Sequence, residues 1–197
     1  KRSVMYVAML GINGFYTKVR TYFDLLNIFN FLKNEFSEYK IIIYVQNLAY
    51  EFQFIRKWIN VTKLFAVEDR KPLYFESDNL IFKCSYLLSG LSLEKMGETV
   101  GVQKQVGKLD YTKVRHSQTP LTYSEELYCL YDLIVLDKYI EKEMETYSHI
   151  CYIPFTKTGK VRKHIKNVCF YGGKKSHKKS GYQYIKYRSK MKNLTLS

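Results

Sequence analysis

Short apolar runs and helical patterns are interleaved along the first 150 residues, and this order constrains the fold more than any other feature. Residues 4–10 and 15–22 have the character of two strands, joined by a turn rich in glycine and asparagine at 11–14. Further elements follow in the order helix 23–36, strand 39–46, helix 48–59, and β-like runs 61–67, 72–77 and 79–85. After these come helix 91–100, for which Ser92 is the predicted cap, loop 101–121 and helix 124–147. The order predicts an α/β fold with a mixed sheet flanked by helices.

The charge is divided unevenly along the chain. Residues 151–197 hold 13 of the 32 Lys and Arg residues and no acid, whereas residues 1–150 are nearly neutral. We therefore expect a folded domain over 1–150 and a basic, extended linker over 151–197, with one helix at 182–192. Phosphate backbones attract such a segment through counterion release. An anionic membrane surface and a solvated tail are the alternatives.

Composition narrows the class of protein. Hydrophobic residues make up 46% of the chain, enough for a sizeable core. Stretches of 18 consecutive apolar residues are absent, so we expect no membrane span and a cytoplasmic protein. The four cysteines form no CxxC pair and no zinc-ligand spacing with the four histidines.

The first candidate constellation is Asn47-Leu-Ala-Tyr50-Glu51-Phe52-Gln53-Phe54, at the predicted boundary between a buried strand and a helix. Functional residues of α/β folds commonly lie at this carboxyl edge of the sheet. In the alternative interpretation, Asn47 caps the helix and Glu51 interacts with its N-terminal dipole.

The second constellation is Tyr128-x-x-x-Asp132 on the longest predicted helix. The i, i+4 spacing places both side chains on one helical face. Asp132 precedes the apolar run Leu-Ile-Val-Leu, so its carboxylate needs a hydrogen-bonding group or a metal as partner. A local hydrogen bond at the edge of the core is the alternative.

These residues, in this order, resemble the exonuclease motifs of protein-primed family-B DNA polymerases. The segment from Asn47 to Phe52 resembles the second motif, and Tyr128-x-x-x-Asp132 resembles the third. Ser85-Tyr86-Leu87-Leu88 resembles a motif of the protein-primed subgroup, and residues 154–162 together with the closing Met-Lys-Asn-Leu-Thr-Leu resemble the stretch joining exonuclease to palm in phage members.

The resemblance implies an RNase H-like fold and removal of 3′-terminal nucleotides from single-stranded DNA with Mg²⁺ or Mn²⁺. It implies that Glu51 and Asp132 bind metal and that Tyr128 orients the attacking water. Contacts with the single-stranded 3′ end are implied for Asn47, Tyr50, Phe54, Ser85, Tyr86 and Tyr111, and contact with the scissile phosphate for Lys104 or Lys108. For the intact protein it implies DNA polymerisation initiated on a terminal protein.

Two departures from the family pattern matter. Glu51 stands where the family usually has Asp. The first motif, Asp-x-Glu, is absent, since no acid precedes Asp24. We expect that motif and its strand to lie before Lys1, so this chain is predicted to lack the first strand of the fold and to be nearly inactive alone.

Two other functions remain open on the sequence. A non-catalytic module could bind single-stranded nucleic acid through its aromatic residues and basic segment. A structural protein could use the same segment to bind acidic partners. Metal-dependent cleavage distinguishes the nuclease from both.

Overall fold

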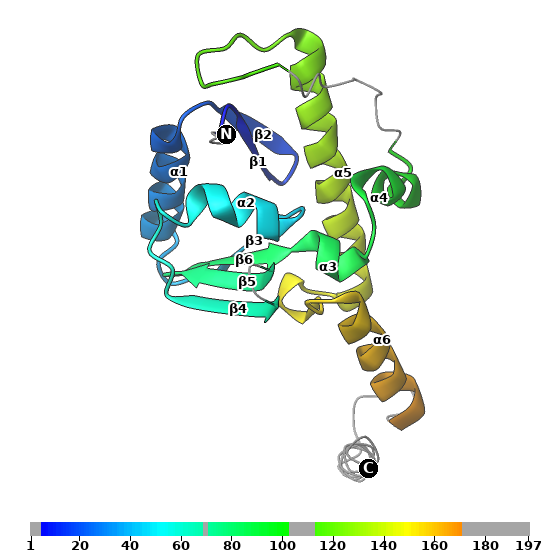
Figure 1. Cartoon of the computed structure of the whole chain (residues 1–197). Coiled ribbons are helices and arrows are strands. Elements are labelled where there is room, and N and C mark those ends of the chain that lie inside the picture. Colours follow the sequence, from blue (N-terminus) through cyan, green and yellow to red (C-terminus); the bar gives the residue numbers. More distant parts are fainter. Residues whose placement is uncertain (1–4, 69–70, 103–112, 171–197) are drawn as a thin grey trace. The chain divides into compact units, whose positions relative to one another are not determined.

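The structure of the chain is a computed structural model that describes residues 5–68, 71–102 and 113–170 (Figure 1). In chain order the elements are β1 (Ala8–Ile12), β2 (Phe15–Val19), α1 (Tyr22–Glu35), β3 (Ile41–Val45), α2 (Leu48–Ile55), β4 (Lys63–Glu68), β5 (Lys71–Ser77), β6 (Leu80–Cys84), α3 (Ser85–Ser89), α4 (Leu93–Val100), α5 (Tyr123–Tyr147), the 3₁₀ turn η1 (Ile150–Tyr152), α6 (Lys157–Ile165) and the π-helical turn η2 (Lys166–Phe170).

The first two strands form an antiparallel hairpin, as predicted. Asn13 and Gly14 occupy its turn with φ of 51° and 79°. Asparagine and glycine tolerate positive φ better than other residues, and this conformation matches the twist of the two strands. The described part of the first strand begins at Ala8, later than the sequence pattern indicates.

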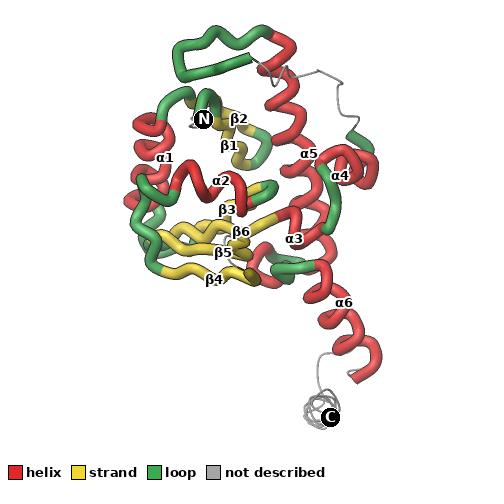
Figure 2. Tube along the Cα trace, viewed as in Figure 1, coloured by secondary structure: helices red, strands yellow, loops and turns green. Residues whose placement is uncertain are grey.

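The other four strands form one mixed sheet in the order β3-β6-β5-β4 (Figure 2). Strands β3 and β6 are parallel, whereas β5 is antiparallel to both of its neighbours. The predicted α/β class with a mixed sheet flanked by helices is therefore confirmed. Because β3 and β6 run in the same direction, the segments that follow them meet at one edge of the sheet.

Aromatic packing fixes two helices to one face of this sheet. Phe75 of β5 and Phe82 of β6 are paired across the strands and stack at 4.3 Å between ring centroids. Phe52 of α2 lies 4.8 Å from Phe75, and Phe29 of α1 lies 5.4 Å from Phe82. All four side chains are buried, and they form the centre of the larger hydrophobic cluster.

A second cluster involves the alternate side chains of the sheet. Tyr44 of β3 packs against it, whereas its neighbours Ile43 and Val45 pack in the first cluster. Successive side chains of a strand point to opposite faces, so the second cluster lies on the other face. Its buried members come mainly from α3, α4 and α5: Leu88, Met96, Val135, Leu136, Tyr139, Ile140 and Ile153.

Several predicted helix boundaries need correction. Helix α5 begins at Tyr123, one residue before the predicted start at Ser124, and the hydroxyl of Thr122 caps it by accepting a hydrogen bond from the backbone N–H of Glu125. Helix α2 ends at Ile55 rather than at residue 59, and the short helix α3 was not predicted. The predicted cap of α4 by Ser92 is confirmed.

The chain divides into two compact units, residues 1–155 and 156–197. The second unit is described up to residue 170. Its helix α6 is capped by Thr156, whose hydroxyl accepts a 3.0 Å hydrogen bond from the N–H of Gly159, and it carries basic residues in its last turn. The prediction of an extended linker is therefore wrong for this part, and the predicted helix over 182–192 lies outside the described residues.

In the described part of the chain, no helix combines the length and the apolar character needed to cross a membrane.

Candidate active site

The C-terminal ends of the parallel strands β3 and β6 lie next to each other. Val45 and Cys84, the last residues of the two strands, are paired in register. The residues that follow them, Gln46 and Ser85, also contact each other, and we call this contact the junction. The hydroxyl of Ser85 donates a 2.6 Å hydrogen bond to Oε1 of Gln46, and Nε2 of Gln46 donates to the carbonyl of Leu91 at 3.3 Å. The two sequence motifs that contain Asn47 and Ser85 therefore begin at neighbouring positions on one sheet edge.

Asn47 occupies the bend between β3 and α2 in an unusual conformation. Its φ and ψ are 54° and 55°, in the left-handed region that few residues other than glycine adopt. The exposed side chain makes no capping hydrogen bond to the helix. In the alternative interpretation Asn47 caps the helix and Glu51 interacts with its dipole; Asn47 is the N-cap residue and Glu51 lies in the first turn, but the cap has no side-chain hydrogen bond. Asparagine adopts this region more readily than most residues that have a side chain, as Asn13 does in the hairpin turn.

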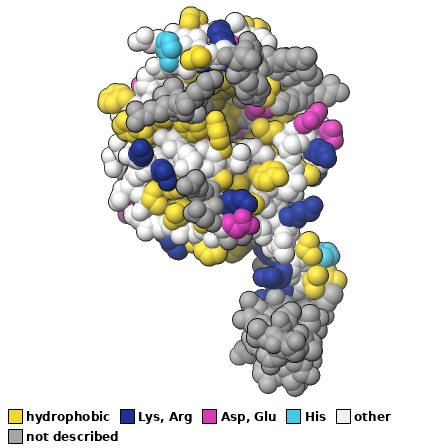
Figure 3. Space-filling view, viewed as in Figure 1, with side chains coloured by type: hydrophobic (Ala, Val, Ile, Leu, Met, Phe, Trp, Pro, Cys, Tyr) yellow, Lys and Arg dark blue, Asp and Glu magenta, His cyan; other side chains and the backbone are white. Residues whose placement is uncertain are grey.

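Helix α2 has a buried side and an aromatic outer side. Leu48 and Phe52 point into the core with exposed fractions of 0% and 7%. Tyr50 is 56% exposed, and its ring lies 5.0 Å from that of Phe54 in an edge-to-face arrangement. Hydrophobic side chains reach the surface in several places on the face of the molecule shown in Figure 3. The Tyr50–Phe54 pair is available for stacking against a planar ligand.

Glu51 lies in the first turn of the same helix. The residue is exposed overall, yet the protein around its carboxyl group removes enough water for desolvation to raise the pKa of this group above its ordinary value of 4.5. Desolvation destabilises the charged form, so a nearby cation would be expected to bind this carboxylate favourably.

Tyr128 and Asp132 lie one turn apart on α5, as predicted, and both are half-buried. Oδ1 of Asp132 is fully buried. The tyrosine and carboxylate therefore share one helical face.

The first hairpin holds this stretch of α5 in place. Tyr16 donates a 2.9 Å hydrogen bond to Asp137, and Lys18 forms an ion pair with Glu126. Desolvation, followed by the contact with Asp137, raises the pKa of Tyr16 to about 12. The two contacts flank the Tyr128–Asp132 segment, which consequently lies along the hairpin.

The remaining predicted site residues differ in exposure. Tyr86 is 47% exposed on α3, whereas Ser85 is fully buried. Lys104, Lys108 and Tyr111 lie outside the described residues. Tyr86 can thus face a ligand, and the hydroxyl of Ser85 instead joins the two strand ends.

A complete metal centre is not present in the described residues. Among them, no group of three or more His, Cys, Asp or Glu side chains is arranged to hold a metal ion. Glu51 and Asp132 have the oxygen ligands that Mg²⁺ and Mn²⁺ prefer, but two carboxylates on separate helices do not make the two-ion cluster of a phosphodiesterase.

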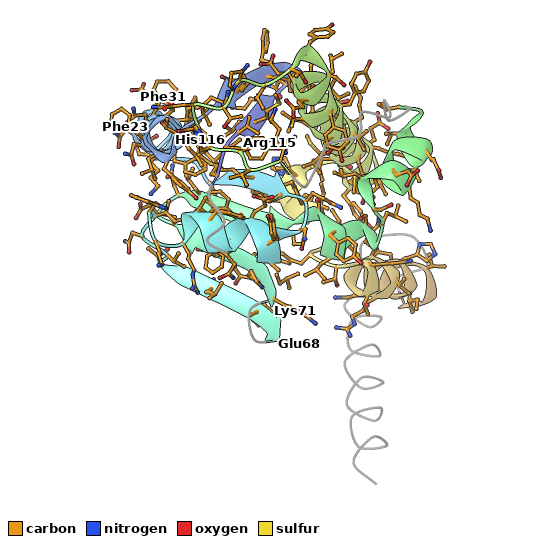
Figure 4. The ribbon with its side chains drawn as sticks, turned by 45° about the horizontal axis from the view of Figure 1, so that its top comes forward. Phe23, Phe31, Glu68, Lys71, Arg115 and His116 are labelled. Carbon is orange, nitrogen blue, oxygen red and sulfur yellow. The ribbon has the colours of Figure 1, made fainter. Side chains whose placement is uncertain are left out.

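Sequence reasoning missed two structural supports of the site. The first is Gln46, whose only sequence signal is its place between a strand and Asn47. The second is the loop before α5. Arg20 links this loop to the N-terminal segment by donating hydrogen bonds to the carbonyls of Thr119 and Tyr6. Arg115 of the same loop, labelled in Figure 4, forms a buried ion pair with Glu125 at 2.6 Å.

Comparisons with protein-family models, with curated proteins and with solved structures find no match to this chain.

Proposed function

We propose that the chain is part of an RNase H-like 3′–5′ exonuclease domain from a protein-primed family-B DNA polymerase. The junction between Gln46 and Ser85 carries this proposal. It joins the beginnings of two family-like motifs, 38 residues apart in the sequence, at the carboxyl edge of parallel strands. Functional sites of α/β folds gather at such edges.

The exposed residues of this edge suit a single-stranded 3′ end. Tyr50, Phe54 and Tyr86 offer aromatic surfaces against which bases can stack without sequence preference. The exposed amide of Asn47, displaced from helix capping by its backbone conformation, is free to hydrogen-bond a nucleotide. We assign the buried Ser85 to positioning this edge rather than to direct contact with DNA.

In this proposal, Glu51 and Asp132 supply two of the carboxylate ligands for Mg²⁺ or Mn²⁺, and Tyr128 orients water. The described residues do not complete the metal site, and the missing Asp-x-Glu motif accounts for the deficit. The isolated chain should therefore bind single-stranded DNA but cleave it very slowly. In the intact protein, the same site would proofread a polymerase that acts in the host cytoplasm with a terminal protein.

The test compares the 197-residue chain with a protein extended at its N-terminus by the residues encoded upstream. With Mg²⁺ and a 5′-labelled single-stranded oligonucleotide, only the extended protein should shorten the 3′ end. Asp132→Ala in the extended protein should reduce the cleavage rate by on the order of 100-fold while leaving binding nearly unchanged.

Asp137→Asn is the matched control, because it removes a carboxylate from the same helix that contacts Tyr16 instead. This variant should retain cleavage. Rapid Mg²⁺-dependent degradation by the unextended chain, or equal loss of binding and cleavage in Asp132→Ala, would contradict the nuclease proposal.

A non-catalytic single-strand-binding module is the second candidate, favoured by the lack of a complete metal centre among the described residues. Either function assigns DNA binding to the basic segment. The affinity for DNA should fall steeply with added salt, and a chain ending at residue 155 should show a flatter dependence, because most of the basic segment is then lost. Fluorescence anisotropy from 50 to 300 mM salt measures both slopes, and equal slopes would exclude this role.

A further inference from the structure

The only tryptophan of the chain lies on the surface, next to a second aromatic ring. Trp58 is in the turn that follows α2, and its indole stacks on the ring of Tyr22 with 5.0 Å between centroids and 19° between planes. The stack joins this turn to the first residue of α1, which lies beside α2 in Figure 1. Neither ring is a member of the two hydrophobic clusters, so the stack lies outside the core.

One face of this indole is open to solvent. Trp58 is 54% exposed, whereas Tyr22 is half-buried. Because Tyr22 covers one face of the indole, the exposed area belongs to the opposite face and to the edge. A ring exposed in this way is a platform on which a nucleobase can stack, since every base has a π-face. We call Tyr22 and Trp58 together the Trp58 platform.

Two exposed cations come directly before the platform in the sequence. Arg56 and Lys57 are both exposed, and no described residue forms an ion pair with either of them. Lys33, by contrast, pairs with Asp78 at 2.8 Å. Cations without an acidic partner keep their full attraction for a phosphate group. The platform therefore has positive charge beside an open aromatic face.

The outer side of α2 connects this surface with the candidate active site. Tyr50, Gln53 and Lys57 follow the spacing i, i+3 and i+7, which places them on one side of the helix and of the turn that continues it. All three are exposed. Between β3 and β4, Glu51 is the only acid. The helical rise from Tyr50 to Trp58 is roughly 12 Å, so a strand of several nucleotides can contact both rings.

We propose that the Trp58 platform binds a nucleobase of single-stranded DNA, with Arg56 and Lys57 contacting the adjoining phosphates. The strand continues from there along the outer side of α2 to Tyr50. Aromatic rings next to unpaired cations suit this polyanion, whereas a protein partner would need a larger apolar area than one indole provides. The platform and both cations lie outside the motif from Asn47 to Phe54. This inference rests on the DNA binding that both candidate functions share, and it does not require cleavage.

The test uses the single tryptophan as its reporter, because all indole fluorescence of the chain comes from Trp58. The full chain is titrated with a twelve-nucleotide oligothymidylate in roughly 50 mM salt and EDTA, so that no cleavage occurs. Stacking of a thymine on the indole should quench the emission by roughly half. The quenching should saturate at the same DNA concentration as the anisotropy of the labelled oligonucleotide. Inorganic polyphosphate, which has charge but no bases, should bind without quenching.

Charge reversal tests the phosphate contacts without removing a partner from another residue. Arg56→Glu and Lys57→Glu should each weaken binding by about fivefold and lower the slope of log affinity against log salt by roughly 0.7. Lys95→Glu, which changes an exposed cation on α4, is the matched control and should change both values much less. Trp58→Ala should weaken binding by on the order of tenfold, and Trp58→Phe, which keeps a ring against Tyr22, should weaken it less.

Three outcomes would overturn the proposal. The first is DNA binding detected by anisotropy with unchanged indole emission, which would place the strand elsewhere. The second is an equal effect of Lys57→Glu and Lys95→Glu, which would mean that net charge and not a local contact sets the affinity. The third is equal quenching by polyphosphate, which would exclude stacking. Cleavage by the extended protein with unchanged indole emission would refute this site alone, whereas quenching without cleavage would refute only the nuclease.

Discussion

Glu51 and Glu125 both lie in the first turn of a helix but have opposite electrostatic environments. Each lies in the first turn of its helix, where the dipole favours a carboxylate. The backbone N–H of Thr122, followed by the guanidinium of Arg115, lowers the pKa of Glu125 to about 2. Desolvation raises the pKa of Glu51, and no described residue forms an ion pair with it.

The difference separates a structural carboxylate from a candidate ligand. Glu125 accepts a 2.9 Å hydrogen bond from Thr122 and bonds from two guanidinium nitrogens of Arg115, so its oxygens are already satisfied within the fold. Glu51 bears the cost of desolvation without such a partner. Groups of the second kind are concentrated at functional sites, although burial alone also produces some of them.

The largest expected effect on the melting temperature concerns Glu125, the structural carboxylate. Glu125→Gln keeps the size of the side chain but removes the charge that Arg115 and the helix N-terminus favour. We expect the melting temperature at pH 7 to fall by roughly 3–6 °C, measured by circular dichroism. Glu126→Gln is the control, since Glu126 pairs with an exposed lysine, and its effect should be smaller.

The pH dependence of the melting temperature tests whether the charge of Glu125 is the cause of this effect. A carboxyl group whose pKa is lower in the folded state stabilises the protein above its unfolded pKa and loses that contribution as the pH falls through the folded value. The difference between wild type and Glu125→Gln should therefore be largest above pH 4.5 and shrink toward pH 2. A constant difference over this range would show that packing, not charge, carries the effect.

Lys83 extends the comparison to a buried cation. It is 5% exposed on β6, and its ammonium lies 4.8 Å from the ring centroid of Phe155 and 5.8 Å from that of Tyr44. Burial lowers its pKa, so the charge is unfavourable and the two rings offset this only in part. None of the described carboxylates forms an ion pair with Lys83. In its electrostatic environment Lys83 therefore resembles Glu51 rather than Glu125.

Lys83→Met should therefore raise the melting temperature slightly, by about 2 °C, because it keeps the length and removes the desolvated charge. Lys83→Ala should lower it, because truncation leaves a cavity beneath Phe155. Thermal denaturation of both variants separates charge from volume. A lower melting temperature for Lys83→Met would mean that the cation–π contacts outweigh the cost of burial.

The sequence predicts what depends on local patterns and misses what depends on distant partners. The hairpin turn at Asn13 and Gly14 and the cap at Ser92 follow from residue preferences, and both are confirmed. The bond between Gln46 and Ser85 joins residues 39 positions apart, and nothing in either local pattern indicates it. Helix α6 was missed because its basic residues favoured a solvated segment, whereas a threonine cap organises it.

The candidate site shows the same division. The positions of Asn47, Glu51, Tyr128 and Asp132 at a strand end or on a helix were predicted from spacing alone. The left-handed conformation of Asn47 was not, because it depends on how β3 turns into α2. The different environments of Glu51 and Glu125 also could not be predicted, since Arg115 approaches Glu125 through a loop.

The smallest expected effect tests the functional side of the comparison. A carboxyl group whose folded pKa is raised stabilises the protein only below its unfolded pKa, and that contribution is lost as the pH rises through the folded value. At pH 7, ionised Glu51 is therefore slightly unfavourable, and Glu51→Gln should raise the melting temperature by about 1 °C or leave it unchanged. The gain should disappear below pH 4.5. A clear fall at pH 7 would mean that Glu51, like Glu125, is held by a favourable partner and is not a candidate ligand.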